Sequence, residues 1–160
     1  MDLTIIAALS ENNVIGIENT IPWHIKRDMQ RFKELTLNHP VIMGRNTYQS
    51  IIYRINHPLP NRKNIVLSNT LPPKEGIYVA KNIEEALQLA ENQDTYIIGG
   101  KAIYESFLSC ANKMELTRVH KYFEGDTFFP PIKWSDWNLV NKITEDGKEF
   151  RYSFETYLRN

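Results

Sequence analysis

Three things that this chain lacks narrow its function first. Only one cysteine, Cys110, occurs among 160 residues, which excludes an internal disulfide framework and favours a reducing compartment. The apolar run Leu3–Leu9 is too short to cross a membrane, and no basic segment precedes it as in a signal peptide. Lys plus Arg and Asp plus Glu number 19 each, so no overall field attracts nucleic acid or an anionic membrane. We expect a cytoplasmic protein with no membrane or nucleic-acid partner.

Metal chemistry and nucleophilic hydrolysis are not indicated either. The four histidines have no ligand-like spacing with one another or with Cys110, and neither a nucleophile elbow nor a Ser-His-Asp order appears. The hydrophobic fraction of 42% and the charged fraction of 24% are ordinary for a globular protein. No linker, repeat or low-complexity tract divides the chain. We expect residues 1–160 to form a single domain without a metal site, and to act as a monomer.

Short apolar runs rich in β-branched residues alternate with amphipathic segments along most of the chain. The apolar runs predict strands at Leu3–Leu9, Pro40–Met43, Asn64–Ser68, Ile77–Val79, Thr95–Ile98 and Met114–His120. The amphipathic segments predict helices at Ile25–Leu37, Asn46–Ile51, Ile83–Glu91 and Ala102–Leu108. Several of the runs lack period-2 alternation, as strands do when both faces of a parallel sheet are covered.

The C-terminal part has a different pattern, typical of an antiparallel hairpin. Trp137–Thr144 and Phe150–Leu158 are predicted as two strands joined by a tight turn at Asp146-Gly147. With the alternating segments, they predict an α/β three-layer sandwich. Its centre is a mostly parallel twisted sheet of about eight strands with an antiparallel C-terminal edge strand, and about four helices cover it. Tyr53–Asn61, which holds two prolines, is expected to be a surface loop.

Glycines stand at the ends of two predicted strands, where ligands of open α/β sheets bind. They lie in the segments Gly44–Thr47 and Gly99–Lys101. Glycine lets the main chain come close to a ligand, and the helix that follows presents free N–H groups to an anion. Taken alone, the first segment is better explained as an ordinary strand-to-helix turn with Asn46 or Thr47 as its N-cap. The glycine pair is not the fingerprint of the Rossmann fold.

Two further strand ends carry polar or basic residues. Ser68-Asn69-Thr70 follows one predicted strand and Lys81 follows another. Arg45 and Lys81, with hydroxyls at successive strand ends, fit a phosphorylated nucleotide. Each of these residues taken alone is also what a solvated surface position carries.

Asp28 stands in a helical stripe that is otherwise apolar. The stripe is made by Ile25, Met29, Phe32 and Leu35, at spacings that place them with Asp28 on one helix face. A carboxyl shielded from water there has a raised pKa, the usual way to make an acid useful near neutral pH. The alternative is that Asp28 lies at the edge of the stripe and only serves the N-terminal turn of the helix, where acids are favoured.

A long segment, Asn12–Trp23, joins the first predicted strand to this helix. Loops of this length inside a compact domain often act as lids. The segment ends in Pro22-Trp23, which places an indole N–H shortly before Asp28. Trp23 can also simply seal the start of the helix by packing against it.

The order of these features resembles dihydrofolate reductase along nearly the whole chain. The matching segments are Ile6-Ala7-Ala8, Val14-Ile15-Gly16, Pro22-Trp23, Asp28 with Phe32-Lys33, Val41–Thr47, Pro58–Arg62, Ile97–Gly100 with Tyr104, Leu116-Thr117, Glu124–Thr127 and Phe129-Pro130. No one motif decides the resemblance, but their number, order and spacing make it specific.

The resemblance implies reduction of 7,8-dihydrofolate to tetrahydrofolate by NADPH, with antifolates as inhibitors. Asp28 would hydrogen-bond the pterin, Thr117 would hold its carboxylate, and the proton would arrive through water. Arg62 would clamp the α-carboxylate of the substrate. The implied catalytic residues are Asp28, Trp23, Thr117, Tyr104 and Ile21, with Trp23 and Ile21 controlling that water. The implied substrate site consists of Ile6, Ala7, Ala8, Asp28, Met29, Phe32, Leu59, Arg62, Ile98 and Thr117.

On the cofactor side, the resemblance implies contacts from several strand ends. Arg45 and Lys81 would bind phosphates and favour NADPH over NADH. The peptide between Gly99 and Gly100 would be cis, and Asp126 would latch the lid. The implied cofactor site consists of Ala8, Ile15, Gly16, Asn19, Gly44, Arg45, Asn46, Thr47, Leu67, Ser68, Asn69, Lys81, Ile98, Gly99, Gly100, Lys101, Ala102, Ile103 and Tyr104.

The sequence departs from the family pattern in three places. Ile52–His57 is longer than the expected short turn, which leaves contacts to the glutamyl tail of the substrate open. Asn61 stands where glycine is frequent, and Asn tolerates the left-handed region best. Lys101-Ala102 follows the glycine pair, where some members carry glycine and then arginine.

Two other functions stay open at this point. One is a different NADPH-dependent pteridine or pyrimidine reductase on the same architecture, such as the reductase domain of the riboflavin pathway. The other is a folate-binding module without turnover. Arg62 argues against the first, because a substrate without a glutamyl tail does not require it. The complete cofactor side argues against the second.

Overall fold

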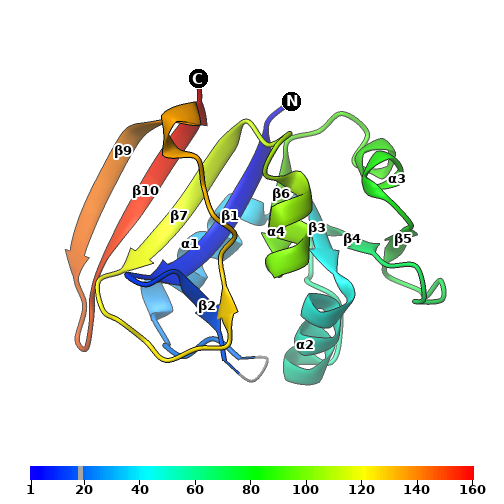
Figure 1. The fold of residues 1–160 in the computed structure, drawn as a ribbon. Helices are drawn as coiled ribbons and strands as arrows, with labels where there is room; N and C mark the ends of the chain where they lie inside the picture. The colour runs from blue at the N-terminus through cyan, green and yellow to red at the C-terminus, as the bar shows by residue number, and fades with distance from the viewer. Residues whose placement is uncertain (18–19) are drawn as a thin grey trace.

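A computed structural model describes residues 1–17 and 20–160, which build a sheet covered by helices on both faces (Figure 1). Within the described residues the eight strands of this sheet have the order β5-β4-β3-β6-β1-β7-β10-β9. Their bounds are β1 Leu3–Ser10, β3 Pro40–Gly44, β4 Lys63–Leu67, β5 Tyr78–Ala80, β6 Thr95–Gly99, β7 Lys113–Val119, β9 Trp137–Asp146 and β10 Arg151–Arg159. A separate ribbon pairs β2 Val14–Gly16 with β8 Thr127–Phe128. The helices are α1 Lys26–Thr36, α2 Arg45–Ile55, α3 Ile83–Leu89 and α4 Lys101–Phe107, with a 3-10 turn η1 at Trp134–Asp136.

Strand direction confirms the predicted fold class. The neighbours from β5 through β7 pair in parallel, and β10 pairs antiparallel with both β7 and β9. Parallel neighbours need a crossover between them, and helices provide several of these crossovers. The carboxyl ends of β1, β3, β4 and β6 therefore point to one end of the molecule, the lower end in Figure 1.

The core is divided by the sheet into two sides. On one side, odd-numbered residues of β1 such as Ile5 pack with α3 and α4, where Phe107 is fully buried. On the other side, Val41 and Met43 of β3 pack with Tyr48 of α2. Strands β1, β3 and β4 are buried along most of their length and consist mainly of apolar residues, as strands covered on both faces do, whereas alternate residues of β6 are only partly buried. This rigid centre fixes the strand ends at which a ligand can bind.

Several elements differ from their predicted bounds. The ribbon of β2 and β8 and the turn η1 were not predicted, because β2 and β8 have only three and two residues. Helix α2 continues through residues 53–55, which were predicted as loop, and ends at Asn56 with φ of 65°. Gly44, rather than Asn46 or Thr47, is the N-cap of α2. Strand β9 runs through Asp146, so four residues, 147–150, connect the hairpin instead of a tight turn at Asp146-Gly147.

Gly125 packs against the ribbon, and its side-chain position is filled. A Cβ there would lie 2.3 Å from Cγ1 of Val14 and 2.8 Å from the carbonyl oxygen of Gly16. Since Val14 is fully buried, it cannot move aside freely. We expect Gly125→Ala to lower the free energy of unfolding by about 1 to 3 kcal/mol, as overpacking does, measured by urea denaturation. The exposed neighbour Glu124 provides the control: Glu124→Ala is expected to leave stability unchanged, and an equal loss in both variants would contradict this packing.

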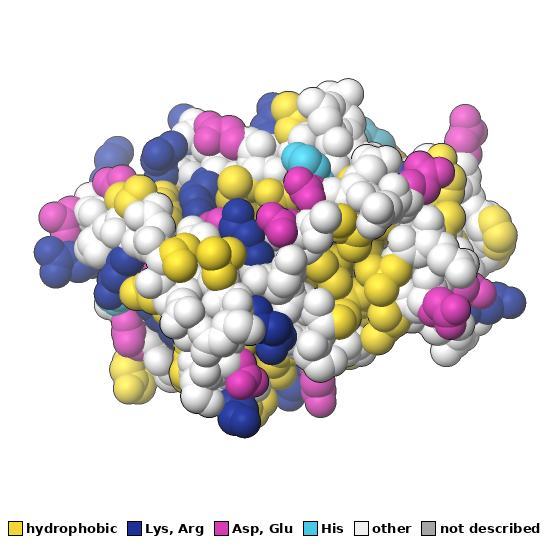
Figure 2. Space-filling model, turned by 90° about the horizontal axis from the view of Figure 1, so that it is seen from above, with side chains coloured by type: hydrophobic (Ala, Val, Ile, Leu, Met, Phe, Trp, Pro, Cys, Tyr) yellow, Lys and Arg dark blue, Asp and Glu magenta, His cyan; other side chains and the backbone are white. Residues whose placement is uncertain are grey.

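The surface at the end that carries both termini shows no dominant charge. Figure 2 views the molecule from this end, and basic and acidic side chains are interspersed over it. No helix among the described residues is long and apolar enough to cross a membrane.

Candidate active site

Two glycines bring neighbouring strand ends together at the carboxyl edge of the sheet. A Cβ on Gly44 would lie 2.9 Å from Cγ1 of Ile103, and a Cβ on Gly99 would lie 3.0 Å from the hydroxyl oxygen of Tyr104. Gly99 also has φ of 115°, where side chains are disfavoured. The peptide between Gly99 and Gly100 is cis, as the resemblance implies. At both positions a side chain of α4 occupies the place of a Cβ, so glycine lets α4 pack closely against the strand ends. A Cβ on Gly100 would meet only Oγ1 of Thr47, at 3.8 Å, so the main chain there is open to a ligand.

Tyr104 connects these strand ends beneath the surface. Its hydroxyl lies 2.8 Å from the carbonyl oxygen of Ile6 and 3.0 Å from that of Ile98, and these two acceptors share its one proton. Burial, and next the charge of Asp28, raise the pKa of Tyr104, so the hydroxyl stays protonated and remains a donor. Tyr104 therefore fixes the end of β6 against β1 and contributes to the positions of both.

Asp28 lies in the first turn of α1, partly buried, facing β7. Its Oδ1 accepts a hydrogen bond of 2.6 Å from Oγ1 of Thr117. Burial raises the pKa of the Asp28 carboxyl above its ordinary value, while the Thr117 hydrogen bond and the charge of Arg31 oppose this and are smaller. The structure thus brings together the acid and the hydroxyl that the sequence placed far apart, and burial makes this acid easier to protonate than an exposed aspartate.

The stripe around Asp28 is narrower than predicted. Ile25 is buried with Trp23 in a cluster that also contains Phe154, and Phe32 is partly buried. Met29 is exposed, so its inclusion in the buried stripe was wrong. Trp23 packs at 5.0 Å between ring centroids against Phe123, which supports its role in sealing the start of α1.

Arg62 lies beside the same helix, next to the last turn of α1. Its Nη1 donates to Oγ1 of Thr36 at 3.2 Å, and its Nε donates to the carbonyl oxygen of Pro60 at 2.9 Å. Burial lowers the pKa of Arg62. Leu59 of the same loop packs against the cluster that includes Ile98. The guanidinium is held at two of its nitrogens and keeps further N–H donors for an anion.

The residues predicted to bind phosphate lie at or near the surface, and Arg45 is exposed. Nη1 of Arg45 donates to Oγ1 of Thr70 at 2.5 Å, and Oγ of Ser68 accepts from the main-chain N–H groups of Thr70 and Leu71. Thr47 lies near Gly100, since a Cβ there would be 3.8 Å from its Oγ1. The following predicted residues are exposed: Asn46, Asn69, Lys81, Lys101 and Ala102. The predicted cofactor residue Asn19 lies outside the described residues.

The ribbon of β2 and β8 lies at the lower end of the molecule in Figure 1, next to the carboxyl end of β1, where the main-chain N–H of Val14 donates to Oγ of Ser10. The predicted residues Ile15 and Gly16 lie in β2, Leu67 ends β4, and Ile103 lies in α4; Ile6, Ala7 and Ala8 lie in β1. The main-chain N–H of Asp126 donates to the carbonyl oxygen of Gly16 at 3.1 Å. The segment predicted as a lid is thus partly a strand, and Ile21 within it is exposed.

Residues 2–159 match the dihydrofolate reductase family. The chain is 42% identical to the dihydrofolate reductase of Buchnera aphidicola subsp. Acyrthosiphon pisum over 99% of this chain and 100% of that protein. The chain belongs to the dihydrofolate reductase family. It is 37% identical to dihydrofolate reductase HdrB of Haloferax volcanii over 97% of this chain and 82% of that protein. Among solved structures, the dihydrofolate reductase from Enterococcus faecalis complexed with NADP(H) and RAB-propyl superposes with a TM-score of 0.90, at 37% identity, over 99% of this chain and 96% of that one.

Where the chain departs from the dihydrofolate reductase pattern, the structure gives the reason. Most of Ile52–His57 is additional helix, because α2 continues to Ile55 before Asn56 ends it in the left-handed region. Asn61 has φ of 59°, so it occupies the conformation for which glycine is frequent. Both departures keep the Pro58–Arg62 loop beside α1.

Sequence reasoning missed a charged pair next to the acid of this dihydrofolate reductase site. Arg31 of α1 and Glu115 of β7 form an ion pair of 2.5 Å, with Glu115 almost fully buried. The signal was a carboxylate between Met114 and Leu116 in an apolar strand, where a charge requires a partner. The identity of that partner was not readable, because Arg31 is far away in the sequence.

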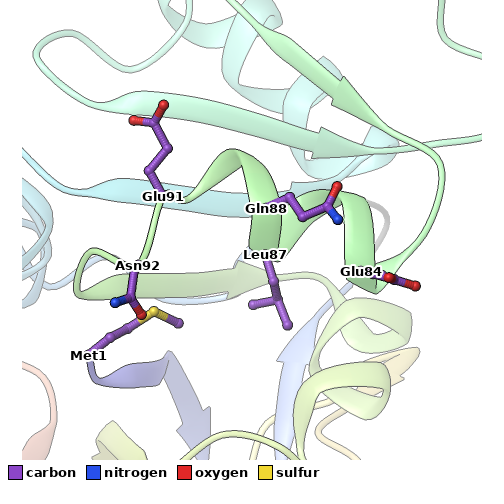
Figure 3. A pocket seen from close by; sticks show the side chains of 6 residues that line it. All are labelled: Met1, Glu84, Leu87, Gln88, Glu91 and Asn92. Carbon is purple, nitrogen blue, oxygen red and sulfur yellow. The ribbon is translucent and has the colours of Figure 1, made fainter.

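A pocket of about 440 Å³ lies away from these residues, against α3 (Figure 3). Its lining consists of Met1, Glu84, Leu87, Gln88, Glu91 and Asn92. Met1 precedes β1, so the pocket lies at the opposite end of that strand from the glycines. Its two carboxylates and apolar side chains do not suit a phosphorylated cofactor, and we do not assign it to the site.

Proposed function

We propose that this chain reduces 7,8-dihydrofolate to 5,6,7,8-tetrahydrofolate with NADPH as the hydride donor. The observation that carries this proposal is a partly buried carboxyl, Asp28, held by Thr117 beside the open carboxyl ends of the strands. Membership of the dihydrofolate reductase family makes the chain an oxidoreductase. Asp28 lies in the first turn of α1 and Arg62 lies beside the last turn, where it donates to Thr36. An arginine at that position supports a substrate that carries a carboxylate tail.

The cofactor side fits a dinucleotide phosphate. A Cβ on Gly100 would meet only Oγ1 of Thr47, at 3.8 Å, so the main chain there is open to a ligand. Arg45 with the Ser68 and Thr70 hydroxyls supplies donors suited to phosphate oxygens. Lys81 adds a positive charge near the end of β5, which favours NADPH over NADH. When bound, the cofactor supplies the hydride, so the task of the chain is to position the reactants and to set the local charge.

Proton supply is the part of the reaction that side chains of this chain would carry. We assign to Asp28 the hydrogen bonds to the amino group and ring nitrogen of the pterin, which its two oxygens can accept together because the oxygen bonded to Thr117 keeps a second lone pair. The resemblance to the family implies that this acid does not reach the nitrogen that gains the proton, so the proton would arrive through a water molecule. Trp23 and Ile21 would limit the access of that water, and Tyr104 would keep the walls made by Ile6 and Ile98 in place.

Incubation with NADPH and dihydrofolate tests this function directly. We expect oxidation of NADPH, followed by its absorbance, and inhibition by an antifolate such as a diaminopyrimidine. Oxidation with a tail-less pteridine or a pyrimidine but not with dihydrofolate would instead indicate the other reductase class. Saturable binding of dihydrofolate without oxidation of NADPH would indicate a binding module. A parallel run with NADH measures the cofactor preference.

We also propose that the chain works as a cytoplasmic monomer with one domain. The sheet includes strands from both ends of the chain, since β1 and β10 flank β7, which supports one folding unit over residues 1–160. The single cysteine supports a reducing compartment. Size-exclusion chromatography with light scattering would test the monomer.

A further inference from the structure

A second polar contact joins α1 to β7, next to the one between Asp28 and Thr117. Arg31 Nη2 lies 2.5 Å from Glu115 Oε2, and Thr156 Oγ1 donates to that same oxygen at 2.8 Å. The Arg31 guanidinium also lies 4.6 Å from the centroid of the Phe154 ring. Arg31 is therefore held by a carboxylate on one strand and by an aromatic face on the next.

The two contacts are neighbours on both elements. Arg31 follows Asp28 by three residues, so the side chains share one face of α1. Glu115 precedes Thr117 by two residues, so both side chains point from β7 to the same side of the sheet. The positive charge of Arg31 already acts on Asp28, whose pKa it lowers. A freed Arg31 would be within reach of the Asp28 carboxylate, as ion pairs at this helix spacing are.

We propose that Glu115 is a positioning residue, which holds the Arg31 guanidinium against Phe154 and away from Asp28. This inference rests on the proposed function, since it explains how the acid avoids a permanent cationic partner. An Asp28 paired with Arg31 would have a lower pKa and would offer the pterin a carboxylate already occupied by a guanidinium. Glu115 provides the alternative partner and keeps the acid available to substrate.

Other ionisable groups lie around the carboxyls of Asp28 and Glu115, but none of those named below takes the place of Arg31 between them. Arg27 of α1 lies 6.0 Å from the Phe154 ring centroid, and Tyr104 and Tyr152 each have a pKa that the Asp28 charge raises further after burial. On the Glu115 side, Lys113 Nζ lies 3.5 Å from Oε1. Tyr96 of β6 has its pKa raised by burial and next by Glu115. Among the groups named, Arg31 alone combines a contact with Glu115 and a position one helical turn from Asp28.

The test is a carbon-13 NMR titration of the Asp28 carboxyl, assigned by its absence in Asp28→Asn. This readout needs no turnover, so it succeeds or fails independently of the proposed reaction. In Glu115→Gln we expect the Asp28 midpoint to move toward acid by about one pH unit, the effect of a close opposite charge. Glu155→Gln is the matched control, because Glu155 is equally buried on β10 but bonds to Tyr157; its midpoint is expected to stay unchanged.

A double-mutant cycle separates positioning from a direct effect of the Glu115 charge. Arg31→Met is expected to move the Asp28 midpoint toward alkali, and adding Glu115→Gln to it is expected to change the midpoint little. The same acid displacement with and without Arg31 would overturn the proposal, as would an unchanged midpoint in Glu115→Gln. If Glu115→Gln does not fold, Glu115→Asp shortens the arm that holds Arg31 and is expected to give a smaller displacement in the same direction; no displacement there would also overturn it.

Discussion

Asp28→Asn is expected to lower kcat/KM for dihydrofolate about 10²- to 10³-fold near neutral pH, within the range for loss of an acid that assists proton transfer. The amide keeps the size of the side chain and can still accept from Thr117, so the fold is expected to survive. Activity is expected to recover partly in acid, because substrate that is already protonated in solution no longer depends on the acid. The measurement is the rate of NADPH oxidation between about pH 5 and pH 9. Turnover equal to that of the unchanged protein across this range would refute the role of Asp28.

The same substitution, which is expected to lower activity, is expected to raise the stability of the folded protein. Because burial raises the pKa of Asp28 in the folded protein above that in the unfolded chain, its ionisation destabilises the fold as the pH rises through the folded pKa. Asp28→Asn removes this cost, so the variant is expected to be more stable than the unchanged protein at neutral pH. The difference is expected to shrink toward low pH, where Asp28 is protonated. Urea denaturation at two pH values measures this, and a variant less stable at neutral pH would indicate a structural carboxylate instead.

Local patterns predicted much of the fold, because they report burial directly. Strands β1, β3 and β4 are buried along most of their length, and the apolar residues that dominate their five to eight positions carry that information. The ribbon of β2 and β8 was not predictable in the same way, because three and two residues are too few for a period. Helix α2 was predicted too short, because Tyr53 and Ile55 are exposed and its last turn therefore does not continue the apolar face of the helix.

In the candidate site, the residues that stand out within a local pattern were predictable, but their partners on other elements were not. Asp28 was detectable because a carboxylate among apolar helix positions is unusual, and the glycines were detectable because they end apolar runs. The partners were not: Thr117 and Glu115 come from a strand more than eighty residues away, and only the paired β1 and β7 bring them beside α1. The resemblance supplied Thr117 but not Glu115. Contacts across the sheet depend on strand order, which the local sequence does not contain.

Arg62→Leu is expected to raise KM for dihydrofolate about 100-fold with little change in kcat or in the affinity for NADPH. A charge-assisted pair with a carboxylate contributes to binding in both ground and transition states, so its loss appears in KM. Arg62 also donates to Thr36 and Pro60, so a purely structural role must be distinguished. A pteridine substrate without a glutamyl tail makes that distinction, because its KM is expected to stay unchanged in the variant.

Two controls sharpen this prediction about Arg62. Arg62→Lys keeps the charge but loses the planar fork, so an intermediate KM is expected. Arg54→Leu removes a second arginine of the same region, exposed in the last turn of α2 and bonded to Ser50, and is expected to change KM little. Steady-state kinetics with both substrates and a fluorescence titration with NADPH supply the measurements. Equal losses of affinity for dihydrofolate and NADPH would mean that Arg62 supports the loop rather than the substrate, because only a carboxylate contact is confined to one of the two ligands.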